Sequence, residues 1–81
     1  MRAAQPRTQH LDVRPLLARG DNVYAAIRQV VDRLQPAQRL EVTAPFLPSP
    51  LIERLGSEGF RSEVKQAGAG VWTVAFWRDP V

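Results

Sequence analysis

The sequence predicts an α/β (α+β) two-layer sandwich in which a four-stranded sheet carries two helices on one face. Four segments alternate apolar and polar residues, two repeat apolar residues at helical spacing, and their order is β-α-β-α-β-β. With 81 residues, of which 44% are hydrophobic, the chain is expected to form one domain with a modest core. Because each alternating segment has a polar side, we expect helices to cover only one face of the sheet.

The first part of the chain predicts a tail, a strand and a connection. Residues 1–9 show no periodicity and are expected to form a flexible tail. Residues 10–14 alternate polar and apolar side chains, which predicts a half-buried strand that Pro15 ends. A connection then leads to the first helix, for which Asp21 or Asn22 supplies the N-cap oxygen.

The first helix and the second strand have the clearest patterns. Apolar residues from Val23 to Leu34 follow the spacing i, i+3, i+4, i+7, i+8 and i+11, which predicts one amphipathic helix. Residues 35–37, which include a proline, are expected to stop this helix. Residues 39–44 alternate, and their even-numbered side chains are predicted to face the core.

The segment TAPFLPSP, residues 43–50, links the second strand to the second helix. Pro45 cannot donate a hydrogen bond to a sheet, so it closes the strand, and Pro48 favours extended geometry in the residue before it. Ser49 followed by Pro50 predicts an N-cap and the first helical position. The apolar residues that follow predict a short helix ended by a glycine.

The last part of the chain predicts a β-hairpin. Residues 60–66 and 71–78 alternate and are joined by a loop that contains glycines. The even-numbered side chains of both strands, Trp72 among them, are expected to face the core. Residues 79–81 are expected to fray, so the folded domain is predicted to span residues 10–78.

The composition limits the chemistry that the chain can perform. It contains no Cys, which excludes thiolate nucleophiles, and its single His excludes a site built from two imidazoles. The net charge is +3, but the basic residues are scattered, whereas nucleic-acid binding needs clustered charge. No apolar run is long enough for a membrane span. We therefore expect a cytoplasmic protein with no cofactor, no metal and no membrane partner, and the scattered charge disfavours a nucleic-acid partner.

Three short motifs resemble the TusA/SirA-like superfamily of sulfur carriers. They lie at Leu11–Arg14, at Pro48–Leu51 and at Val71–Trp72, and the similarity covers residues 10–78. The chain is most similar to a bacterial branch of unknown function, which is sometimes attached to hemerythrin-like or cupin-like domains. The resemblance implies a mixed sheet with strand order 1-2-4-3, in which the last strand is antiparallel to the others.

Two departures separate the chain from the chemistry of that superfamily. Sulfur carriers place a Cys-Pro pair at the start of the first helix, whereas this chain has Gly20 near that position and no cysteine anywhere. Persulfide transfer is therefore not implied. Some members of the branch carry Asp-His-Asp before the second helix. Residues 45–47 here are Pro, Phe and Leu, which offer no metal ligand.

The polar candidates lie around the first strand. His10, Asp12 and Arg14 share one face of it, and a His beside a carboxylate suits acid–base catalysis or metal binding. The alternative, which we favour, is a solvated face on which Asp12 and Arg14 orient the connection to the first helix. Residues 19–21, Arg-Gly-Asp, offer an anion pocket or, as we prefer, a helix cap.

Two aromatic residues are the remaining candidates. Trp77 is predicted on the open face of the sheet between Arg39 and Arg61, where it either anchors an interface or stacks on arginines of its own chain. Phe46 follows the second strand, beside the connection that follows the first. With Leu16 or Leu17 it is predicted to form an apolar binding patch. Alternatively, Phe46 covers the first helix as a lid on the core.

These observations favour a non-catalytic accessory or interaction module. Its expected partner is another protein, a companion domain or a second copy of the chain, and the oligomeric state is left open. One alternative is a redox- or sulfur-linked accessory protein that uses a partner's cofactor. A second alternative is a weak nucleic-acid binder, for which retention on DNA would depend steeply on salt.

Overall fold

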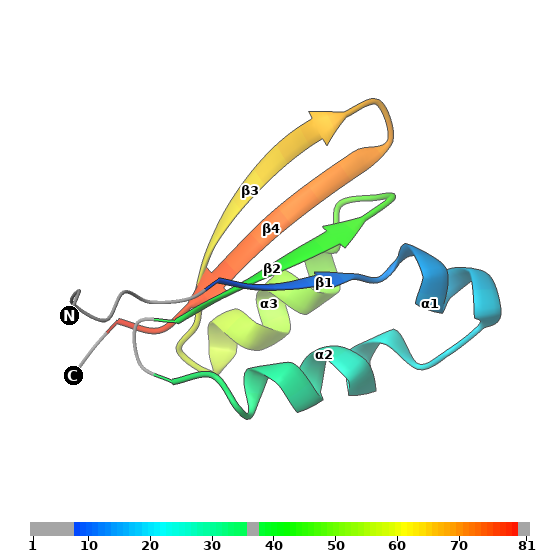
Figure 1. Cartoon of the computed structure of the whole chain (residues 1–81). Coiled ribbons are helices and arrows are strands. Elements are labelled where there is room, and N and C mark those ends of the chain that lie inside the picture. Colours follow the sequence, from blue (N-terminus) through cyan, green and yellow to red (C-terminus); the bar gives the residue numbers. More distant parts are fainter. Residues whose placement is uncertain (1–7, 36–37, 80–81) are drawn as a thin grey trace, which may run out of the picture.

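The computed structural model describes residues 8–35 and 38–79, which form four strands and three helices (Figure 1). In chain order these elements are β1 (Thr8–Asp12), α1 (Arg14–Arg19), α2 (Val23–Val31), β2 (Arg39–Ala44), α3 (Ser49–Ser57), β3 (Arg61–Gly68) and β4 (Val71–Trp77). The predicted α/β class is confirmed.

The four strands form one mixed sheet in the order β1-β2-β4-β3. The strands β1 and β2 are parallel, and β4 is antiparallel to both of its neighbours. The strand order and the direction of the last strand are therefore as predicted. The crossover from β1 to β2 contains α1 and α2, as a parallel pair of neighbouring strands requires.

The core lies between one face of the sheet and the helices α2 and α3. Leu40 and Val42 of β2 are buried, as are Val74 and Phe76 of β4. Against them pack buried side chains of both helices, namely Ile27, Val31 and Leu55. Burying an aliphatic or aromatic side chain of this size stabilises a fold by about 1.5–3 kcal/mol. The period-two and helical patterns of the sequence thus meet in one apolar layer.

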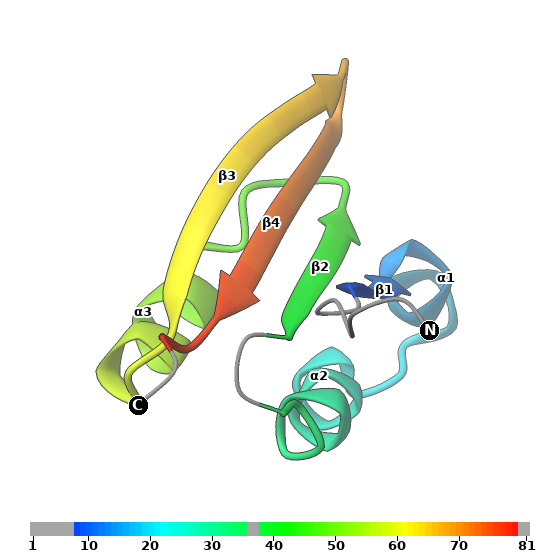
Figure 2. The same ribbon diagram turned by 60° about the vertical axis from the view of Figure 1, so that its left-hand side comes forward.

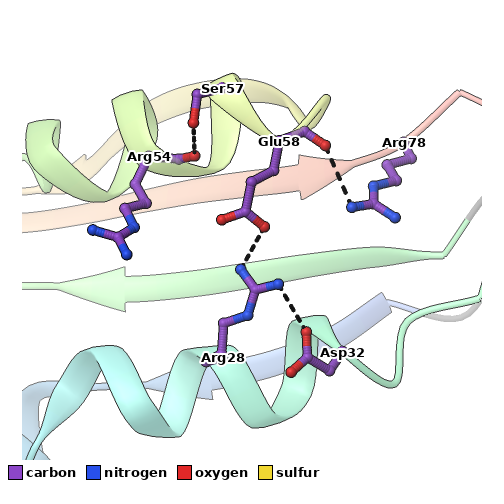
Figure 3. Close-up of polar contacts among 6 residues, drawn as sticks. All are labelled: Arg28, Asp32, Arg54, Ser57, Glu58 and Arg78. Atoms are coloured by element: carbon purple, nitrogen blue, oxygen red, sulfur yellow. Dashed lines mark hydrogen bonds and ion pairs between the residues drawn. The ribbon is translucent and has the colours of Figure 1, made fainter.

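Polar contacts join α2 to the C-terminal end of α3 (Figure 3). The guanidinium of Arg28 donates to Glu58 and also pairs with Asp32, with an N···O distance of 3.0 Å for the latter. The hydrogen bond to Glu58 is the main cause that raises the pKa of Arg28. Arg78 donates to the backbone oxygen of Glu58 over 3.3 Å. These contacts hold both helices in register over the sheet.

The N-terminal boundary differs from the prediction. The strand β1 begins at Thr8, so the last two residues of the predicted tail, residues 8 and 9, belong to the sheet and pair with Arg39 and Leu40. The rest of the predicted tail lies outside the described residues. At the other end Asp79, predicted to fray, forms an ion pair with Arg61 at 2.8 Å.

The predicted connection after the first strand is instead the helix α1, so the described part of the chain has three helices where two were predicted. Pro15 lies in its first turn, where a proline suits the helical backbone and no N–H is needed. Gly20 ends the helix with a φ of 74°, in the left-handed region that favours glycine. The strand thus ends at Asp12 and not at the predicted Arg14, and Pro15 lies inside the helix that follows.

The helix caps agree with the prediction at one site and differ at another. Asn22 caps α2 by accepting a hydrogen bond from the backbone N–H of Ala25. The prediction that Ser49 caps α3 is wrong, because Pro48 occupies the N-cap position and no side chain caps this helix. The backbone N–H of Ser49 donates to the oxygen of Leu47 over 2.9 Å, which draws Ser49 into the first turn.

The hairpin is less buried than its sequence pattern predicts. Every residue of β3 is exposed, and Val64 retains 41% of its surface. Trp72 is half-buried and lies outside the core cluster. Figure 2 shows the reason, since β3 and β4 extend well beyond the helices. Their alternation predicts a face of the sheet but not whether a helix covers it.

Candidate functional site

The candidate site lies where β1 and β2 end. Because these strands are parallel, their carboxyl ends lie at the same end of the sheet, and in Figure 1 both arrows run toward the right, the side on which α1 lies. The chain leaves β1 directly into α1, and it leaves β2 through residues 45–48, which we call the corner. Two segments that are distant in sequence are thereby brought together, as the carboxyl ends of α/β sheets commonly do at functional sites.

An apolar cleft of about 400 Å³ opens between these segments and the helices α2 and α3. Its base consists of Val13, at the junction of β1 and α1, together with Val42 and Ala44 of β2. All three residues are buried in the core. The base of the cleft is therefore a surface of the close-packed core, which is stiff because core side chains interlock.

Two helices form one wall of the cleft. Leu17 of α1 lines it and is 38% exposed, and Val23 and Ile27 of α2 line it as well. Leu16 does not line the cleft but packs against the core. Of the two leucines named from the sequence, only Leu17 therefore lies beside the cleft.

The corner and the start of α3 form the opposite wall. Phe46 lines the cleft and is 51% exposed, while Pro48 beside it is buried. Pro50 and Leu51 continue this wall into α3. Each proline fixes its backbone φ near −65°, which limits the freedom of the corner. Phe46 is thus an exposed aromatic side chain on a restricted backbone.

The cleft has two polar lining residues, Tyr24 and Arg54, in the part of the chain that is described. The guanidinium carbon of Arg54 lies 5.1 Å from the centre of the Tyr24 ring, which is a cation–π distance. Arg54 forms no ion pair with any described residue. An uncompensated positive charge therefore lies beside an apolar cleft.

Sequence reasoning did not select Tyr24 or Arg54. Both carry a helical signal that could have found them, because residues three apart lie on the same face of a helix. Tyr24 precedes Ile27 by three residues, and Arg54 follows Leu51 by three. Ile27 and Leu51 both line the cleft, so the helical spacing brings their polar neighbours to it as well.

The position of Phe46 agrees in part with each of the two interpretations that the sequence left open. It lines the same cleft as Val23, as a lid would, but half of its surface is exposed. A lid that completed the core would be buried to the degree of Phe60 or Phe76, which are 7% and 0% exposed. Its role as a contact residue stays a prediction.

Asp12 and Arg14 form a two-pronged ion pair outside the cleft. Nε and Nη2 of Arg14 donate to the two carboxylate oxygens of Asp12 over 2.9 and 2.7 Å, and the backbone N–H of Arg14 donates to Oδ1 over 3.0 Å. The side-chain hydrogen bonds from Arg14 lower the pKa of Asp12 from 3.8 to about 2. The pair links the end of β1 to the first turn of α1, the helix that carries Leu17.

The other polar candidates lie apart from the cleft. His10 is largely exposed, and its Nδ1 lies 3.5 Å from a carboxylate oxygen of Glu41. Arg19 and Asp21 pair with each other at 3.0 Å. No group of three His, Asp or Glu side chains suited to a metal ion occurs among the described residues.

Trp77 lies on the open face of the sheet, directly between Arg39 of β2 and Arg61 of β3. The guanidinium carbon of Arg39 lies 4.1 Å from the centre of the indole ring, so Trp77 stacks on an arginine of its own chain. The structure does not bring Trp77 near the cleft, from which the sheet separates it.

One of the comparisons with known proteins finds a match. Residues 10–78 match the model of a family described as an uncharacterized conserved protein family, DUF2249. No curated protein and no solved structure matches the chain significantly. No helix among the described residues is long and apolar enough to cross a membrane. The matched segment covers every element from the middle of β1 to the end of β4, and the chain therefore belongs to the DUF2249 family.

Proposed function

We propose that this domain is a non-catalytic interaction module whose apolar cleft binds an apolar side chain of a protein partner or companion domain. The observation that carries the proposal is the exposure of Leu17 and Phe46, which line one cleft from α1 and from the corner. Exposed apolar side chains that line a concave surface commonly mark binding sites. The stiff base and the proline-restricted corner reduce the entropy that is lost when a partner binds.

The dimensions and the charge of the cleft indicate the kind of segment that fits. A volume of about 400 Å³ falls in the range of ligand pockets and accommodates a large apolar side chain with part of its backbone. Arg54 supplies a positive charge beside Tyr24. We therefore propose a segment in which an aromatic residue or leucine lies close to an aspartate or glutamate, whose carboxylate pairs with Arg54.

The lining of the cleft supports binding rather than catalysis. Among the described residues its polar groups are the phenol of Tyr24 and the guanidinium of Arg54. Acid–base catalysis requires a group that titrates near neutral pH within reach of the substrate, and covalent catalysis requires an activated nucleophile. His10 and the pair formed by Asp12 and Arg14 do not line the cleft.

We also propose that the module is related to the sulfur carriers that the sequence resembles and that it acts in a bacterial cytoplasm. Two features support this relation: the order of the elements, and the strand order β1-β2-β4-β3 that the resemblance implies. Because the chain has no cysteine, the module would retain the platform of a carrier without its sulfur chemistry.

Selection from a random peptide display library tests the proposal without knowledge of the natural partner. We expect enriched peptides to combine an aromatic residue or leucine with a nearby acidic residue. Binding of these peptides should fall at least tenfold in Phe46→Ser and in Leu17→Ser, which corresponds to about 1.4 kcal/mol or more. Arg54→Met should weaken the binding of acidic peptides more than the binding of matched peptides in which an amide replaces the acid.

Leu47→Ser is the matched control. Leu47 is as exposed as Leu17 and adjoins Phe46, yet it does not line the cleft. We expect the selected peptides to bind this variant as they bind the unmodified chain. A selection that enriches no sequence, or enriched peptides that bind Phe46→Ser and Leu17→Ser with undiminished affinity, would contradict the proposal.

A further inference from the structure

One of the two edges of the sheet is formed by β3, which has no second neighbouring strand in the part of the chain that the structure describes. All eight of its residues are exposed, and the hairpin extends beyond the helices (Figure 2). Every second residue of such an edge directs its backbone N–H and C=O outward, where they can pair with another strand. The edge also carries an exposed apolar side chain, Val64.

Symmetry restricts how two copies of β3 could pair. A closed dimer requires a two-fold axis, and an axis perpendicular to the sheet makes the two edge strands antiparallel. Because outward-pointing backbone groups recur at every second residue, paired residues must both be odd-numbered or both be even-numbered. The ladder to β4 is regular up to Gln66 and shifts between Gln66 and Gly68. Residues 61–66 are thus available for regular pairing.

Two registers give the longest regular overlap of this segment. Centred on Glu63, the first register places Glu63 opposite its own copy and Arg61 opposite Lys65 of the second copy. Every charged pair is then repulsive, which is unfavourable for residues directly opposite each other. Centred on Val64, the second register places Val64 against its own copy and Glu63 opposite Lys65 of the second copy, twice by symmetry. Its charges are complementary.

We propose that two copies of this domain associate through β3, with the two-fold axis at Val64, to form one continuous sheet. Glu63 and Lys65 lie on the open face of the sheet with Thr73 and Ala75. Neither forms an ion pair with a described residue of its own chain. Association gives each of them a partner of opposite charge and covers Val64 on the other face, where the helices leave it exposed.

This inference goes beyond the proposed function and does not rest on it. No residue of β3 lines the cleft, so pairing at this edge leaves the cleft open. The dimer would present two clefts to a partner, which strengthens binding to a partner that carries two matching segments. Failure of the peptide selection would leave the edge pairing untouched, and failure of the edge pairing would leave single-site peptide binding untouched.

Charge reversal at the edge provides the test, with sedimentation equilibrium at chain concentrations up to about 1 mM as the measurement. The unmodified chain is expected to approach twice the mass of one chain as its concentration rises. Glu63→Lys alone would oppose lysines at each pair, and Lys65→Glu alone would oppose glutamates, so each variant should remain monomeric. An equimolar mixture of the two variants restores both complementary pairs and should form a mixed dimer.

Glu53→Lys, an identical charge change at an exposed residue of α3, is the control and should dimerise like the unmodified chain. Circular dichroism of the variants should show an unchanged fold, because both edge positions are exposed. An unmodified chain that stays monomeric at every concentration would overturn the proposal. So would single variants that dimerise as well as the unmodified chain, or a mixture that forms no more dimer than its components.

Discussion

The strands β2 and β3 carry the same alternation of apolar and polar residues, yet the structure uses them differently. In β2 the even-numbered side chains are buried against α2 and α3, and Leu40 is 0% exposed. In β3 the corresponding side chains remain in solvent, and Val64 is 41% exposed. The difference shows that alternation defines the two faces of a strand, whereas the reach of the helices decides which face is buried.

The strands β2 and β3 are also expected to differ in what they contribute to stability and to association. The strand β2 is packed against the helices, and its core side chains Val42 and Ala44 help to form the base of the cleft. The hairpin contributes Val74 and Phe76 to that core but leaves its outer strand free. We therefore expect substitutions in β2 to change the free energy of unfolding, and those in β3 to change association.

The largest effect is expected from emptying the core. Leu40→Ala should lower the free energy of unfolding by about 2–5 kcal/mol, since a buried leucine leaves a cavity. Val64→Ala should change it by less than about 0.5 kcal/mol in dilute solution, because the side chain is exposed. Urea denaturation of both variants measures the difference. Equal losses would show that the two strands are buried alike.

Phe46→Ser is expected to have an intermediate effect on stability. About half of the side chain is buried, so the free energy of unfolding should fall by about 1–2 kcal/mol, less than the 3–5 kcal/mol of a fully buried aromatic. Thermal or urea unfolding measures this loss. A loss as large as that of Phe76→Ser, which removes a fully buried ring, would show that Phe46 is a lid on the core.

The contact of Arg28 with Glu58, which joins α2 to the end of α3, should contribute somewhat less to stability than the side chain of Phe46. Arg28→Met keeps much of the apolar stem but removes the hydrogen bond to Glu58, which is partly buried. We expect a small loss in the free energy of unfolding, below that of Phe46→Ser. Arg33→Met, in the turn that follows α2, is the control, because Arg33 is exposed and has no ion pair with a described residue. Similar losses in both variants would argue against the contact.

The smallest effect is expected from Asp12, and it depends on pH. The pKa of Asp12 is lowered in the folded protein from 3.8 to about 2, chiefly by the hydrogen bonds from Arg14. A carboxyl group whose pKa is lowered by folding stabilises the fold in full at pH values above its unfolded pKa, here 3.8. This contribution to stability is lost as the pH falls toward the folded pKa of about 2. The difference in stability between the unmodified chain and Asp12→Asn should therefore be constant above about pH 5 and shrink below pH 4. A difference that stayed constant down to pH 2 would contradict the ion pair.

Much of this fold could be predicted from the sequence, because it depends on local periodicity. The helix α2 and the strands β2 and β4 each extend over enough residues to show a period. The six residues of α1 are too few for a helical period, and Pro15 is equally compatible with the end of a strand. The burial of the hairpin depends on where distant helices end, which no local pattern records.

The site was predictable in part for the same reason. That Phe46 and Leu17 line one cleft follows from the parallel pairing of β1 and β2, which brings their carboxyl ends together. The choice of Leu17 over Leu16 depends on the helical turn of α1, which the sequence pattern did not reveal. Arg54 and Tyr24 were missed because neither is unusual in an exposed helix until a cleft lies beside it.

Mapping a bound peptide by NMR distinguishes the cleft from the rest of the surface. A peptide enriched by the selection is added to the ¹⁵N-labelled domain, and the shifts of the amide resonances are followed to saturation. We expect the largest shifts at Leu17, Tyr24 and Phe46, around the cleft, and little change at Trp77 on the opposite face of the sheet. Shifts that centre on Trp77 and its neighbouring arginines, with the cleft unaffected, would contradict the assignment of the cleft as the binding site.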